Sequence, residues 1–214
     1  MSKSLAELRR EYALGALSKA DVDPDPIKQF QRWLREAIDA QLPEPNAMTL
    51  ATADRTGRPY ARVLLLKDCD ADGFVFFTNY RSDKGRQLAE NPHAALVFLW
   101  LELERQVRIE GAVAKIPGAE SEAYFRSRPR ESRLGSLASR QSQIVASRQA
   151  LDERFQQLAA QYPDDNIPMP HHWGGYRVRP GLLEFWQGRH GRMHDRLRYR
   201  LRKDGDWLLE RLEP

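Results

Sequence analysis

The chain has 214 residues, with 34 lysines and arginines against 30 aspartates and glutamates and an isoelectric point near 9.3. Its 41% hydrophobic residues are enough for a core, which excludes global disorder, and the length fits one large domain or two small ones. The longest apolar run, Ala94 to Leu101, is far shorter than the ~20 residues of a membrane-spanning helix, and the N-terminus does not resemble a signal peptide. Cys69 is the single cysteine, so we expect no internal disulfide and a reducing compartment, the cytoplasm.

The first predicted elements are helices. A short helix is expected from Ser4 to Leu14. A longer helix begins at Asp25-Pro26, because aspartate is a common N-cap and proline suits the first helical position. Apolar residues then recur at three- and four-residue steps to about Gln41, which is typical of an amphipathic helix.

From Ala47 onward the sequence is typical of β-structure. Short apolar runs are separated by turn-like clusters that contain aspartate and glycine, and this pattern predicts strands joined by tight turns. We expect strands over residues 47–53, 59–67, 73–78, 93–101 and 104–116. One helix is expected over residues 82–91, where the Asn91-Pro92 pair ends it.

The second half of the chain mixes both kinds of element. Helices are expected over residues 117–126, 129–138 and 146–161, and strands over residues 176–187, 192–202 and 207–212. Eight short strands with helices around them favour a mainly β, α+β fold, an antiparallel barrel with peripheral helices. A Rossmann sheet is disfavoured, since no G-x-G-x-x-G motif follows a strand.

Spacing and composition argue against a metal site and a hydrolytic site. His190 and His194 are flanked by glycines that oppose a helix, and on a strand they would lie ~13 Å apart, too far to share a metal ion. No carboxylate or thiol completes a ligand set, so we expect no metal. Cys69 lies between two aspartates, which raise the pKa of a thiol, and no nucleophile-elbow motif is present.

Arginines are concentrated in one segment. Four of them lie between Arg126 and Arg133 together with two serines, close to Tyr124. Arginine, serine and tyrosine are donors that suit a phosphate monoester, and a helix starting after Pro129 would add backbone N–H groups. The arginine excess also leaves a nucleic acid open as a partner, while codon bias and a solvated surface are equally simple explanations.

The stretch from Leu183 to Arg196 combines aromatic, amide and basic residues. If residues 192–202 form a strand, Arg192, His194 and Arg196 point to one face. Three such groups on an otherwise apolar strand are costly to bury without an anionic or polar partner. This pattern therefore indicates a bound ligand.

The same stretch closely resembles the signature of the pyridoxamine 5'-phosphate oxidase family, with each specified position filled. The resemblance covers nearly the whole chain, and several independent motifs in register argue against chance similarity. These motifs are Arg9-Arg10-Glu11-Tyr12, Arg62 to Lys67, Phe77-Thr78-Asn79, Glu104-Arg105-Gln106-Val107, Tyr124 to Ser132, Gln141-Ser142, Phe185-Trp186-Gln187-Gly188, and an ending of the type Arg211-Leu212-x-Pro214.

The resemblance implies a fold, an assembly and an activity. The family folds as an FMN-binding split antiparallel β-barrel and forms a homodimer with two FMN molecules at the subunit interface. It oxidises pyridoxamine or pyridoxine 5'-phosphate to pyridoxal 5'-phosphate in vitamin B6 biosynthesis and salvage, with dioxygen reduced to hydrogen peroxide and ammonia released from the amine. We therefore expect one domain over residues 1–214, with residues 1–20 as an arm over the substrate and residues 172–214 carrying the signature and dimer contacts.

By position, the resemblance also implies roles for single residues. The expected FMN site consists of Arg62, Val63, Leu64, Leu65, Lys67, Phe77, Thr78, Lys84, Gln106, Gln141, Ser142, Trp186 and Arg196. The expected substrate site consists of Arg9, Tyr12, Lys67, Tyr124, Arg128, Ser132, Arg192 and His194. Arg192 and His194 are the expected catalytic pair, and His194 is the better candidate base because arginine stays protonated at neutral pH.

One position departs from the family pattern. Asp83 stands where a second basic residue usually precedes Lys84. A carboxylate facing the FMN phosphate would repel it, so we expect Asp83 to turn away and to cap the helix over residues 82–91. Arg81 or Arg86 is the expected source of the missing positive charge.

Two rival functions remain open at this stage. A split-barrel flavoprotein such as a flavin reductase needs the FMN contacts, but it does not need the group Tyr124, Arg128 and Ser132 together with Arg192 and His194. A nucleic-acid-binding protein would use the arginine excess, would bind with steep salt dependence and would carry no flavin.

Overall fold

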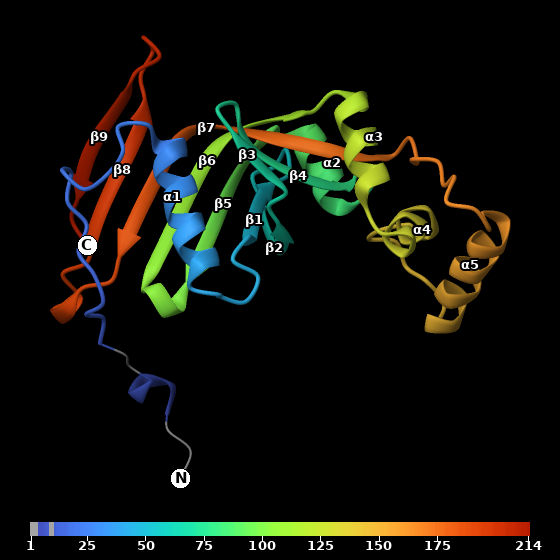
Figure 1. Cartoon of the computed structure of the whole chain (residues 1–214), viewed down its shortest axis with the longest axis horizontal. Coiled ribbons are helices and arrows are strands. Elements are labelled where there is room, and N and C mark those ends of the chain that lie inside the picture. The colour runs from blue at the N-terminus through green and yellow to red at the C-terminus, as the bar shows by residue number, and fades with distance from the viewer. Residues whose placement is uncertain (1–3, 9–10) are drawn as a thin grey trace.

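Within the described part of the chain, residues 4–8 and 11–214, nine strands of the computed structural model form one antiparallel sheet (Figure 1). Hydrogen-bonded neighbours follow the order β2-β1-β5-β6-β7-β4-β3, and β8 and β9 extend from β7 as a hairpin. The strands are β1 (Ala47–Ala53), β2 (Pro59–Leu65), β3 (Asp68–Asp70), β4 (Gly73–Asn79), β5 (His93–Trp100), β6 (Arg105–Lys115), β7 (Trp173–Gln187), β8 (Asp195–Leu201) and β9 (Trp207–Leu212).

Helices flank this sheet. They are α1 (Pro26–Asp39), α2 (Asp83–Glu90), α3 (Gly118–Ser127), α4 (Arg130–Ala138) and α5 (Arg148–Gln161). Helix α1 begins as the sequence predicts, because the Asp25 carboxylate accepts the N–H of Ile27 at 2.9 Å and Pro26 occupies the first helical position. None of the described helices is long and apolar enough to cross a membrane.

The main core lies between α1 and one face of the sheet (Figure 1). Phe30 and Trp33 of α1 are buried, and their rings contact aromatic residues of the sheet, including Phe98 and Phe185. Because side chains alternate along a strand, every second residue of β1 and β5 contributes to this core. The opposite face of the same strands is incompletely covered, and Leu99 on β5 is 56% exposed.

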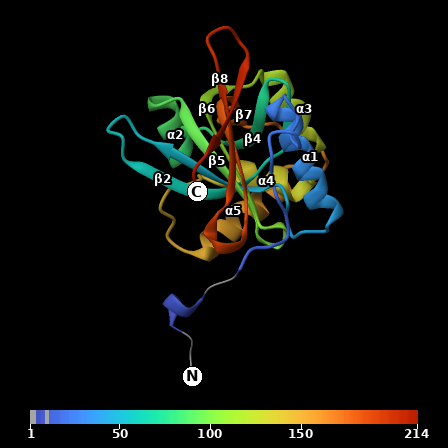
Figure 2. The same cartoon turned by 90° about the vertical axis from the view of Figure 1, so that its left-hand side faces the viewer.

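A second, smaller core holds the helices at the far end of the molecule. Phe125 of α3, Leu134 of α4, Ile167 and Trp173 are buried together there. Helices α4 and α5 thus lie at the opposite end from the β8–β9 hairpin, and Figure 2 looks onto that hairpin with the C-terminus beside it. Strand β7 has 15 residues and pairs with β6, β4 and β8, so it connects the two ends.

The mainly β fold with peripheral helices is confirmed, but the expected N-terminal helix and one expected strand differ, and one short strand was not expected. The helix expected from Ser4 to Leu14 is not formed in the described residues of that range: one 3-10 turn covers Leu5–Glu7, and residues 11–17 have no regular structure. The strand expected over residues 192–202 begins only at Asp195, because Gly191 and Arg192 have positive φ angles of 64° and 62° that turn the chain. The short strand β3 was not predicted, since its aspartates are typical of turns.

Candidate active site

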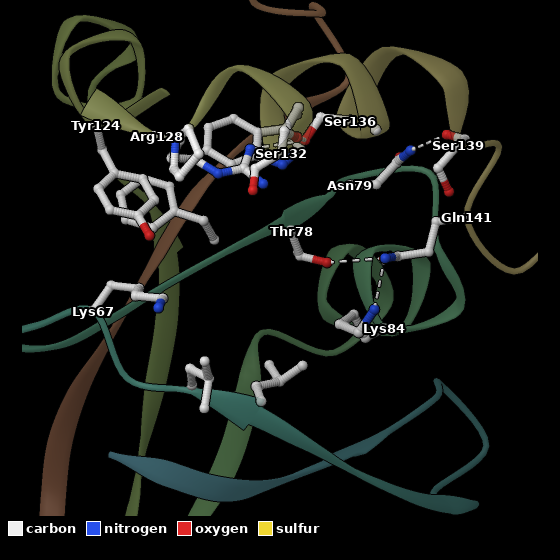
Figure 3. Close-up of a pocket in the computed structure, with 16 residues that line it drawn as sticks. Lys67, Thr78, Asn79, Lys84, Tyr124, Arg128, Ser132, Ser136, Ser139 and Gln141 are labelled. Atoms are coloured by element: carbon white, nitrogen blue, oxygen red, sulfur yellow. Dashed lines mark hydrogen bonds between the residues drawn. The ribbon is translucent and has the colours of Figure 1, made fainter. Parts of the chain in front are cut away.

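A cavity of about 590 Å³ lies where the ends of β2 and β4 meet helices α2, α3 and α4 (Figure 3). Among the described residues, its lining includes three cationic side chains and no carboxylate, which suits an anionic ligand. The lining residues are Leu64, Leu65, Lys67, Phe77, Thr78, Asn79, Lys84, Tyr124, Arg128, Pro129, Ser132, Gly135, Ser136, Ser139, Gln141 and Trp173.

One end of the cavity collects the four residues expected to bind a substrate phosphate. Lys67 follows β2, whereas Tyr124, Arg128 and Ser132 come from α3, α4 and the turn between them (Figure 3). Arg128 is held by two contacts: it donates to Oγ of Ser136 at 2.8 Å, and its guanidinium lies 4.8 Å from the centre of the Trp173 ring. Burial lowers the pKa of Arg128, but an arginine remains charged at neutral pH.

Aromatic rings form a rigid wall beside this group. The Phe77 ring stacks on Tyr124 with centroids 3.9 Å apart, and on Trp173 with centroids 5.3 Å apart. Burial raises the pKa of Tyr124, so its hydroxyl stays protonated and available as a donor at neutral pH. Phe77 and Trp173 come from neighbouring strands, β4 and β7, whose pairing fixes the wall.

The other end of the cavity contains a buried lysine. Lys84 donates to Oε1 of Gln141 at 2.8 Å, and Thr78 donates to the same oxygen at 3.1 Å (Figure 3). Burial, and to a smaller extent repulsion from Arg62, lowers the pKa of Lys84 to about 8. An ammonium group that is desolvated in this way is stabilised by an anionic ligand, which fits the phosphate of a nucleotide-like cofactor.

The structure turns Asp83 away from this lysine, as expected. Asp83 forms an ion pair with Arg86 on the same helix, while the N-cap is Ser82, whose Oγ accepts the N–H of Gly85. The expectation that Asp83 itself caps the helix is therefore wrong, because the residue before it already fills that position. Arg81 donates to Nε2 of His171 at 2.8 Å, and neither Arg81 nor Arg86 lines the cavity, so the structure does not place the expected replacement charge of either residue at the site.

A second cluster of expected site residues lies near the β8 end of the molecule. The Trp186 ring is 4.7 Å from the His194 ring, and Tyr12 packs edge-on against both, at 5.6 and 5.8 Å between centroids. The expected row of Arg192, His194 and Arg196 on one strand is not formed, because β8 begins after His194. Arg196 instead donates through Nε to the buried carboxylate of Glu184 at 2.8 Å.

Strand register explains why the expected cofactor residues are divided. Gln106 pairs with Leu99 and Trp186, and Trp186 pairs with Arg196, so these side chains share the incompletely covered face of the sheet. Val63 on β2 belongs to the same face and is 69% exposed. Arg62 points to the other side, where it donates to Thr52 and Gln87, and Ser142 accepts the N–H of Asp83 outside the cavity.

The structure shows which of the arginines between residues 126 and 133 reach the cavity and which lining residues the sequence did not predict. Of the four arginines between residues 126 and 133, Arg128 faces the cavity, while Arg126 pairs with Glu122, Arg130 donates to the carbonyl of Tyr162, and Arg133 pairs with Asp165. Arg9 lies outside the described residues. Asn79, Ser136, Ser139 and Trp173 line the cavity without having been predicted as site residues.

The sheet, its helices and the cavity lined by three cationic side chains define a split-barrel protein of the flavin-binding type. Residues 34–162 match the model of the pyridoxamine 5'-phosphate oxidase family, and residues 173–214 match its C-terminal dimerisation region. The chain therefore belongs to the pyridoxamine 5'-phosphate oxidase family.

Individual relatives support this membership. The chain is 58% identical over 211 residues to the pyridoxine/pyridoxamine 5'-phosphate oxidase of Paraburkholderia phymatum, covering 99% of both chains. It is 56% identical to that of Trichormus variabilis over the full length of both. Among solved structures, PhzG from Burkholderia lata 383, in complex with tetrahydrophenazine-1-carboxylic acid, is similar with a TM-score of 0.88 and 33% identity over 94% of this chain and 100% of PhzG.

Proposed function

We propose that this protein is an FMN-dependent oxidase that converts pyridoxamine or pyridoxine 5'-phosphate to pyridoxal 5'-phosphate. The observation that carries the proposal is the cavity in which Lys67, Tyr124, Arg128 and Ser132 gather at one end and Lys84 lies at the other. Two separated groups of cationic and hydroxyl donors suit two phosphate-bearing molecules, a cofactor and a substrate, bound side by side.

The residues of the cavity fit FMN by their chemistry. Lys84 is a buried ammonium group for a phosphate, Gln141 and Thr78 offer amide and hydroxyl groups to a heterocycle's polar edge, and Leu64 and Leu65 give an apolar surface. FMN would supply the acceptor for two electrons from the substrate and pass them to dioxygen. The alcohol then gives aldehyde and hydrogen peroxide, whereas the amine also takes up water and releases ammonia.

A homodimer accounts for the division of the site. Gln106, Trp186, Arg196 and Val63 lie on the incompletely covered sheet face, apart from the cavity of the same chain. We propose that this face packs against a second copy, so that each cavity is completed by residues of the partner chain. The match of residues 173–214 to a dimerisation region supports this arrangement.

The chain's own residues would then bind the substrate, orient its reacting carbon and move a proton at that carbon's substituent. The group of Lys67, Tyr124, Arg128 and Ser132 would hold the substrate phosphate and so fix the position of the reacting carbon. His194 accepts the N–H of Arg189 through Nδ1 at 3.1 Å, which leaves Nε2 to accept or donate a proton at the substrate. Arg192, which lies outside β8, would contact the substrate ring from the same turn.

One assay tests the proposal directly. The purified protein should be yellow, and it should release hydrogen peroxide with pyridoxine 5'-phosphate but not with unphosphorylated pyridoxine. Reduction of free flavin by a nicotinamide donor, without peroxide from either vitamer, would instead identify a flavin reductase. A colourless protein with salt-dependent nucleic-acid affinity would support the nucleic-acid alternative.

The PhzG structure contains tetrahydrophenazine-1-carboxylic acid, which has no phosphate, so a requirement for the phosphorylated vitamer would distinguish the substrate of this protein from a ligand of that kind. We expect the reaction to occur in the cytoplasm.

A further inference from the structure

Glu104 carries a buried carboxylate that contacts a distant part of the chain. Its Oε2 accepts the backbone N–H of Ala13 at 2.8 Å and that of Leu14 at 3.0 Å, and the residue is 3% exposed. Hydrogen bonds to a carboxylate are charge-assisted and stronger than those between neutral groups. Glu104 therefore connects the start of β6 to a segment 91 residues earlier, residues 11–17, which has no regular structure of its own.

The backbone of Glu104 is held from the other side. Its carbonyl accepts the N–H of Gly188 at 2.8 Å and the side-chain N–H of Gln187 at 3.2 Å. The residue has a φ of 53°, a left-handed conformation that is uncommon for a residue other than glycine. The contacts with the end of β7 stabilise this conformation, which directs the carboxylate toward residues 13 and 14.

Tyr12 is the side chain that these contacts position. It precedes Ala13 and packs edge-on against the rings of Trp186 and His194. A Cβ atom on Gly188 would lie 2.7 Å from Cβ of Tyr12, so only glycine allows this close approach. Farther along the segment, the N–H of Leu17 donates to Asp195 at 3.0 Å.

We infer that Glu104 is a positioning residue, which fastens residues 11–17 so that Tyr12 covers the His194 ring. We place its action at the backbone N–H groups of Ala13 and Leu14 and not at the substrate. The expected effect of Glu104 on substrate binding rests on the proposed function, whereas its expected effect on the position of residues 11–17 does not. Loss of the carboxylate should free Tyr12 and weaken substrate binding more than it slows turnover.

Hydrogen–deuterium exchange tests the fastening without reference to activity. In Glu104→Ala, the amides of residues 12–16 should exchange at least about tenfold faster than in the unaltered protein, the factor expected for loss of a charge-assisted hydrogen bond. Glu104→Gln keeps an acceptor oxygen without the charge and should give an intermediate rate. Glu102→Ala, which removes an exposed carboxylate two residues away, should leave the rate unchanged. Peptides from β6 report whether the sheet remains folded.

Steady-state kinetics with pyridoxine 5'-phosphate complete the test. We expect KM to rise several-fold in Glu104→Ala, with partial recovery in Glu104→Gln and a change of less than about twofold in kcat. Unchanged exchange at residues 12–16 overturns the inference, and so does faster exchange with an unaltered KM. An unaltered protein that does not oxidise the vitamer overturns the proposed function instead, and the exchange rates still decide whether Glu104 holds the segment.

Discussion

Lys84 of helix α2 donates a hydrogen bond of 2.8 Å to Gln141, which follows helix α4, and so joins two walls of the cavity. The ammonium group is buried, and within the described chain the structure shows no ion pair that neutralises it. Its pKa is lowered to about 8 by burial and by the neighbouring Arg62. An anion bound here would therefore favour the protonated form of Lys84. The affinity of the site for an anion should accordingly depend on pH.

FMN binding should weaken as pH rises through the pKa of Lys84. Protonated Lys84 attracts a phosphate and neutral Lys84 does not, so affinity for the flavin-free protein should fall about tenfold between pH 7 and 9. Fluorescence quenching of FMN measures this, and Lys84→Met should bind weakly at both pH values. Arg81→Ala is the matched control, because Arg81 faces His171 and should not alter affinity. A pH-independent affinity in the unaltered protein would contradict the prediction.

The stability of the flavin-free protein should rise with pH over the range in which FMN affinity falls. An unfolded chain keeps Lys84 at its ordinary pKa of 10.5, so between about pH 8 and 10.5 the unfolded state binds more protons than the folded state. The free energy of unfolding should therefore gain a favourable contribution from this residue as pH rises across that interval. Urea denaturation of the protein and of Lys84→Met at pH 7.5 and 9.5 isolates this contribution by difference.

Arg128 should determine affinity for phosphorylated substrate. Arg128→Ala removes a guanidinium that is held by Ser136 and Trp173, and kcat/KM for pyridoxine 5'-phosphate should fall about 30-fold or more. Arg126→Ala is the control, since Arg126 lies two residues away, is exposed and pairs with Glu122. Equal losses in the two variants would show that general charge, and not the cavity, attracts the substrate.

Mixed dimers should reveal whether each site uses two chains. Arg128→Ala and Arg196→Ala alter the two separate clusters, and each homodimer should be nearly inactive. If the clusters combine across the interface, a heterodimer has one unaltered site, and an equal mixture should recover about a quarter of full activity. If each site belongs to one chain, both sites of the heterodimer remain altered and no activity returns. Unfolding and refolding the mixture together supplies the exchange of subunits.

Cys69 should resist alkylation in the folded protein. Burial, together with Asp68 and Asp70, raises the pKa of its thiol to about 12, so only about one molecule in ten thousand carries a thiolate at pH 8. Iodoacetamide should label the thiol slowly in the folded protein and rapidly after urea denaturation, as mass spectrometry measures. Rapid labelling without denaturant would show that the thiol is more accessible than its contacts indicate.

The sequence by itself determined what depends on short spacing. Alternating apolar residues marked most strands, Asp25-Pro26 marked the start of α1, and Tyr124, Arg128 and Ser132 fall within nine residues, so one helix pair brings them together. The family motifs identified the other candidate site residues, but they did not show which of these residues lie together in the fold. A pattern over a few residues can specify these features because helix and strand geometry repeat locally.

Only the tertiary structure decided which distant residues share a site. Trp173 reaches Phe77 because β7 pairs with β4, and Gln106 lies beside Trp186 and Arg196 because β6, β7 and β8 are neighbours in the sheet. The positive φ of Arg192 displaced the expected Arg192–His194–Arg196 row, and residues 11–17, which contact the Glu104 carboxylate through the N–H groups of Ala13 and Leu14, form no helix. Such contacts depend on burial and hydrogen bonding between residues far apart in the chain, such as Ala13 and Glu104, which are 91 positions apart, and local spacing does not encode them.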